Sequence, residues 1–155
     1  MDFSEQIAKH LYEVYFGGNW TVTNFKETLS DVSWKEATTE VEEFNTIVTL
    51  VFHTNYFVKT VSRVLNNEGL SGNDKFSFDH PEFTSEEEWR AFVNDTLEDA
   101  KTLSESIKKL PNEKLMESFT DKKYGLYNRN LWGVIEHCHY HLGQIVMLKK
   151  LVQPN

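Results

Sequence analysis

Apolar residues recur every three or four positions in four long segments of the chain, the spacing of an amphipathic α-helix. These segments cover about residues 3–16, 45–66, 84–110 and 130–152. Gly17-Gly18 ends the first segment and Pro111 ends the third, as expected for helix breakers. No segment shows the alternation of a strand between hairpin turns. The pattern therefore predicts an all-α fold built on four long helices, typical of a four-helix bundle.

The second segment is rich in β-branched residues, which favour strands, but its length decides against one. A strand of more than twenty residues would be exceptional, whereas a helix of that length is ordinary. Asn45 and Asn130 stand at the start of the second and fourth segments and are expected to cap them. A shorter helical piece is expected within residues 20–29, and residues 67–81, with two glycines and a proline, are expected to form a loop.

Length and charge restrict the class of protein. A chain of 155 residues without internal repeats predicts a single domain, residues 1–155. Its net charge of −8, with 16 scattered basic residues, argues against nucleic acid as a partner. No stretch approaches the roughly 18 apolar residues of a membrane span. The first residues lack the basic start and apolar run of a signal peptide, so we expect a cytoplasmic protein.

The high aromatic content bears on ligand binding and oligomerisation. Eleven Phe, six Tyr and four Trp predict a bulky core with a pocket between helices that accepts a small-molecule ligand. They also favour an exposed apolar face and hence a homodimer, although the sequence does not locate that face.

The final segment contains the most informative motif, His137-Cys138-His139-Tyr140-His141. His137 and His141 are one helical turn apart and share a flank of the helix, so both can reach one metal ion. His53, at the edge of the apolar stripe of the second segment, is the candidate third ligand. His139 projects from the opposite flank and is left out of this set.

A structural explanation competes with the metal site. Histidines at the margin of an apolar face often form hydrogen bonds within the core, and two histidines four residues apart occur by chance. The spacing lacks the glutamate of the zinc-protease motif His-Glu-x-x-His, and no phosphate-binding glycine loop is present. The pattern identifies no catalytic residue. Cys138 is expected to be a small buried hydrophobe, and Gln144 to orient an imidazole or a water.

Three features in combination resemble the DinB/YfiT-like superfamily along nearly the whole chain. They are Gly17-Gly18-Asn19-Trp20 after the first helix, the mid-helix His53, and the final His137-x-x-x-His141 followed by Gly143-Gln144. The resemblance implies an up-up-down-down four-helix bundle in which His53, His137 and His141 bind a divalent metal, commonly zinc or nickel. Leu142 departs from the arginine that often precedes Gly-Gln in the family.

The resemblance leaves the activity open. Family members include metal-dependent transferases that use a low-molecular-weight thiol, a thiol-dependent isomerase and proteins without an assigned reaction. The leading hypothesis is a metal-dependent thiol S-transferase. Two alternatives stand beside it: metal-dependent hydrolysis, and a non-catalytic, stress-related binding module with a structural metal.

Overall fold

The computed structural model describes residues 2–153, and these form an all-helical fold without a named strand. Four helices are long: α1 (Phe3–Phe16), α4 (Ile47–Leu65), α5 (Glu86–Lys108) and α6 (Tyr127–Val152). The connections carry the short helices α2 (Phe25–Leu29) and α3 (Trp34–Ala37) and the 3-10 turns η1 (Asp74–Phe78), η2 (Asn112–Met116) and η3 (Lys122–Tyr124). Within this part of the chain, every helix is too short or too polar to cross a membrane.

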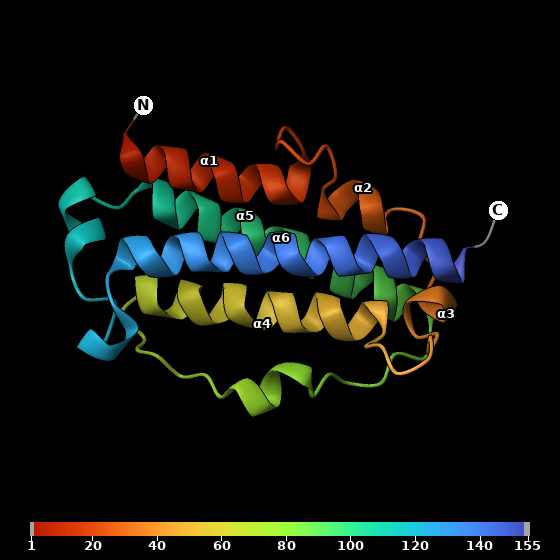
Figure 1. Cartoon of the computed structure of the whole chain (residues 1–155). Coiled ribbons are helices and arrows are strands. Elements are labelled where there is room, and N and C mark those ends of the chain that lie inside the picture. Colours follow the sequence, from red (N-terminus) through yellow and green to blue (C-terminus); the bar gives the residue numbers. More distant parts are fainter. Residues whose placement is uncertain (1, 154–155) are drawn as a thin grey trace.

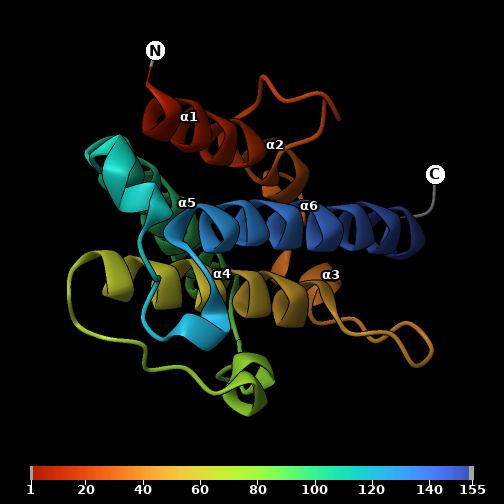
Figure 2. The same cartoon turned by 60° about the vertical axis from the view of Figure 1, so that its left-hand side comes forward.

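The four long helices lie side by side, with α6 between α1 and α4 in both views (Figures 1 and 2). Helices α1 and α4 each pack against α5 and α6. Helices α1 and α6 run in one direction, and α4 and α5 run in the other (Figure 1). This order differs from the up-up-down-down order that the resemblance implies. The difference arises because the segment between α4 and α5 returns along the length of α4, so that α5 starts at the same end as α4.

The core is formed by the apolar stripes that the sequence predicts. Trp89 is among the largest fully buried side chains, and its indole Nε1 donates a 2.7 Å hydrogen bond to the carbonyl of Val32. The neighbouring Arg90 guanidinium donates to the carbonyls of Leu29, Ser30 and Val32. These bonds satisfy the backbone between α2 and α3 and fix that connection to α5.

Two predicted helix starts are displaced. Thr46 rather than Asn45 caps α4, and its side chain accepts a hydrogen bond from the Thr49 N–H. Asn130 does not cap α6, because the helix begins three residues earlier at Tyr127. Its amide instead donates to the carbonyls of Tyr124 and Leu126 at 2.8 Å each. An asparagine near a helix start can therefore be mistaken for an N-cap in the sequence, although it lies inside the first turn and bonds to the preceding carbonyls.

Candidate metal centre

Three histidine side chains converge where α4 and α6 pack together. The His53 ring comes from α4, and the His137 and His141 rings come from successive turns of α6. Nε2 of His137 lies 3.0 Å from Nε2 of His53 and 3.1 Å from Nε2 of His141. One nitrogen from each ring lies within 4.8 Å of the others, which is close enough to hold a metal ion. The three side chains that the sequence singled out therefore meet in space.

The spacing of these nitrogens suits a small divalent cation. Metal–nitrogen bonds of about 2.0–2.1 Å place tetrahedral ligand atoms about 3.3 Å apart and octahedral neighbours about 2.9 Å apart. The two Nε2 separations fall between these values. In the described part of the chain, no further His, Cys, Asp or Glu joins the three in this cluster. The residues therefore fit a metal and leave coordination positions for other ligands.

Hydrogen bonds fix the protonation of two of the rings. Ser77 donates its hydroxyl proton to the Asp74 carbonyl at 2.6 Å, so at 2.8 Å it accepts a proton from His53 Nδ1. Gln144 Oε1 accepts from His141 Nδ1 at 2.6 Å. Because a neutral imidazole carries a single N–H, both rings direct a lone pair from Nε2 into the cluster. This is the tautomer that metal binding through Nε2 requires.

The His137 ring cannot satisfy both of these lone pairs. A neutral ring has one proton: on Nε2 it can be donated to only one of the two facing lone pairs, and on Nδ1 it leaves both short Nε2 contacts without a hydrogen bond. Its Nδ1 is buried and has no hydrogen-bond partner among the described residues. A cation attracts every lone pair at once. A metal bound to the three Nε2 atoms would therefore satisfy the contact that no hydrogen bond can satisfy.

Burial keeps the three rings neutral. Removal from water, together with the neighbouring His141 and His53 rings, lowers the pKa of His137 from 6.5 to about 4. Burial is also the largest cause of the lowered pKa of His53 and of His141. Because a protonated imidazole has no lone pair for a metal, these shifts keep the donor atoms available at neutral pH.

The turn η1 completes the centre and was not anticipated from the sequence, which predicted a long loop over residues 67–81. It supplies Ser77, which orients His53, and Phe78, whose ring stacks on His53 at a centroid distance of 4.0 Å. The available signal was the segment Phe76-Ser77-Phe78, which places two aromatics in a mostly polar loop. The predicted orienting role of Gln144 agrees with its bond to His141.

The remaining histidines lie outside the cluster. His139 lies on the opposite flank of α6, where its ring centroid is 5.7 Å from that of His10 on α1. This agrees with its exclusion from the metal set. His80, in the segment before α5, has its Nε2 3.0 Å from the Thr49 hydroxyl at the start of α4.

Cys138 is not suited to act as a nucleophile. It is fully buried, and its sulfur lies 3.4 Å from the hydroxyl of Tyr15. Burial raises the pKa of its thiol from 9.0 to about 12. A thiol that stays protonated and out of solvent packs as a hydrophobe, as the sequence predicted.

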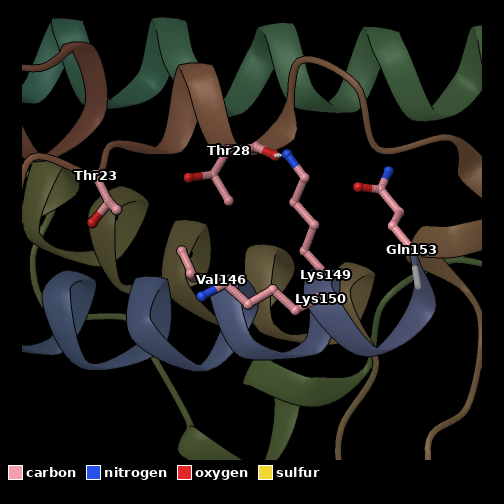
Figure 3. Close-up of a pocket in the computed structure, with 6 residues that line it drawn as sticks. All are labelled: Thr23, Thr28, Val146, Lys149, Lys150 and Gln153. Carbon is pink, nitrogen blue, oxygen red and sulfur yellow. Dashed lines mark hydrogen bonds between the residues drawn. The ribbon is translucent and has the colours of Figure 1, made fainter. Parts of the chain in front are cut away.

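Two cavities flank the histidine cluster. One, of about 680 Å³, is lined by His137, by apolar side chains that include Phe57, and by basic residues. The other, of about 540 Å³, is mainly apolar and is lined by Gln144. A third cavity, near the carboxyl end of α6, contains no histidine (Figure 3). There Lys149 donates to the Thr28 carbonyl and pairs with Asp31, so it attaches α6 to α2 and the residues that follow it.

Comparison with protein-family models, curated proteins and solved structures gives no significant match.

Proposed function

We propose that this chain is a divalent-metal-binding protein with a DinB-like four-helix bundle, and that it transfers a low-molecular-weight thiol to an electrophile. The observation that carries the proposal is the convergence of one ring nitrogen each from His53, His137 and His141, with Nε2 of His137 close to Nε2 of both other rings. The choice of a thiol as co-substrate comes from the family resemblance of the sequence. Zinc and nickel both suit a site of imidazole nitrogens.

The chain supplies binding and orientation. Ser77 and Gln144 hold two of the rings with their Nε2 lone pairs toward the ion, and the aromatic rings of Phe57 and Phe78 shield His53 from water. When bound, a divalent ion lowers the pKa of a thiol beside it and so provides a nucleophile at neutral pH. This chemistry does not use Cys138, whose thiol is buried.

The transfer itself is a substitution at the electrophile. A carbon–sulfur bond forms, the leaving group departs with its bonding electron pair, and the thiol proton passes to solvent. An open coordination position is the requirement that separates this function from a purely structural metal. The cluster holds three histidines and no fourth His, Cys, Asp or Glu among residues 2–153, which supports the catalytic proposal over the structural one.

The decisive experiment measures zinc content, zinc affinity and thiol transfer together. Zinc-loaded protein is mixed with L-cysteine and 1-chloro-2,4-dinitrobenzene, and formation of the thioether is followed by absorbance. We expect turnover only when both zinc and thiol are present. The His53→Ala variant should lose zinc and activity together, because two imidazoles hold zinc more weakly than three.

The matched control is His80→Ala, which removes a histidine outside the cluster and should retain zinc and activity. Full zinc content and full activity in His53→Ala would refute the proposed site. Hydrolysis of 4-nitrophenyl acetate by the zinc-loaded protein without any thiol, with no thiol transfer, would instead establish the hydrolase.

A further inference from the structure

We propose that the cavity beside His137 contains a carboxylate-binding subsite formed by Arg129, Lys122 and Lys123. The subsite selects small molecules that carry an anionic group at one end and the group that reacts at the histidine cluster at the other. All three basic residues line the same cavity as His137. The statement that the other end of the ligand reacts at the histidine cluster rests on the proposed function.

A single ridge of α6 connects the basic residues to the metal centre. Arg129, Gly133, His137 and His141 follow one another at intervals of four residues, so they lie along one side of the helix. Gly133 is the small member of this ridge. A Cβ atom at position 133 would lie 3.0 Å from Nη1 of Arg129, so the guanidinium lies directly over this glycine. The absence of a side chain lets Arg129 point along the ridge toward His137.

The turn η3 brings two lysines to the same cavity. Lys122 and Lys123 are exposed, and the ammonium of Lys123 lies 4.8 Å from the centre of the Tyr124 ring. Asn130 of α6 donates to the Tyr124 carbonyl, and this bond fixes the turn against the helix that carries Arg129. The three cations therefore come from two elements that are attached to each other.

The nearby acidic groups leave this positive charge largely uncompensated. Glu136 lies 3.8 Å from Nη1 of Arg129, but both side chains are about 70 % exposed, so the pair is weak. Asp121 accepts a hydrogen bond from the Lys123 N–H and serves the turn. Asp74, in η1, is on a different element, and its charge acts to raise the pKa of His53 and His137. In a chain with a net charge of −8, three cations at one cavity stand out as an anion site.

The cavity also limits the shape of the ligand. Phe57, Val61 and Val134 line it together with the basic residues and His137, so the stem of the ligand is apolar. Arg129 and His137 are separated by two helical turns, about 12 Å along the axis. The arginine side chain extends over Gly133 toward His137, which shortens this distance by about one turn. A carboxylate about 6–12 Å from the reacting atom fits this distance.

Matched probes test the subsite directly. Isothermal titration calorimetry measures the affinity of metal-free protein for hexanoate and for hexan-1-ol. The same measurement on zinc-loaded protein compares 6-mercaptohexanoate with 6-mercaptohexan-1-ol. We expect the carboxylate of each pair to bind about 10- to 100-fold more tightly at low salt, the contribution of hydrogen bonds to a charged group. The preference should weaken as salt is added.

The variant Arg129→Gln with Lys122→Gln should abolish the carboxylate preference and leave zinc affinity unchanged. Lys150→Gln, near the carboxyl end of α6, removes an unrelated cation that lines a different cavity (Figure 3) and should leave the preference intact. Equal affinity for carboxylate and alcohol in zinc-loaded protein would overturn the subsite while the metal centre stands. Carboxylate preference in a protein that binds no zinc would support the subsite and overturn the proposed function.

Discussion

Acidification should destabilise the metal-free protein through His137. In the unfolded chain this imidazole titrates near its ordinary pKa of 6.5, whereas burial and the two neighbouring rings lower the pKa to about 4 in the folded chain. Between these values the unfolded state binds more protons than the folded state, so the free energy of unfolding falls as the pH falls. The stabilisation is complete above pH 6.5 and is lost as the pH falls toward 4.

The size of the effect follows from the two pKa values. Between pH 8 and pH 5, protonation of the unfolded chain at His137 costs the folded state at most about 2 kcal/mol of stability, and solvent screening reduces this value because the ring is only partly buried. The pKa values of His53 and His141 are also lowered, so their titration adds to the loss in the same direction. Staying above pH 5 leaves the carboxylates largely ionised and isolates the histidines.

Urea unfolding followed by tryptophan fluorescence in the presence of EDTA measures this loss. The His137→Gln variant removes the titrating ring, so between the two pH values its stability should fall less than that of the wild type, by at most about 2 kcal/mol. His80→Gln removes a histidine outside the cluster and should behave as the wild type. If His137→Gln loses as much stability as the wild type, the ring is not held neutral by its surroundings and the electrostatic argument is wrong.

Three further predictions test the site and the core. Gln144→Leu should weaken zinc binding by about 10- to 100-fold, measured by competition with a chelator, because it removes the acceptor that orients His141; unchanged affinity would contradict this role. Ellman's reagent should leave Cys138 unmodified in native protein at pH 8 and react with one thiol per chain in urea, since the side chain is buried; rapid native reaction would refute its burial. Trp89→Phe should lower the free energy of unfolding by about 1–3 kcal/mol, because the Val32 carbonyl loses one of its two donors, Arg90 being the other, and a cavity remains; equal urea midpoints would exclude this contribution.

Helical periodicity was sufficient to locate the four long helices, because each buries one stripe against its neighbours. The helix ends were less predictable. Asn45 and Asn130 both have side chains suited to capping, yet one lies just outside α4 and the other inside the first turn of α6. The direction of α5 depends on the path of the preceding connection, and the sequence of a loop does not determine that path.

The histidine cluster was predictable because two of its members are one helical turn apart and share a flank with Gln144. His53 required the additional inference that α4 and α6 are neighbours. Ser77 and Phe78 could not be placed, since their positions depend on η1 folding back on α4 rather than on any local periodicity. Arg129 is exposed and, without Gly133 beneath it, would appear only as one more surface charge.

His53 is held by two residues of η1, so in the proposed metal site the retention of the ion would depend on local opening of this surface turn. Whenever η1 lifts from α4, the imidazole loses the hydroxyl of Ser77 that holds its tautomer and the ring of Phe78 that covers it. A captured ion favours the closed turn by mass action, so loading should protect this stretch from proteases and slow its amide exchange. In the proposed metal-bound protein, opening of the long connection between α4 and α5 would therefore control how fast the metal dissociates.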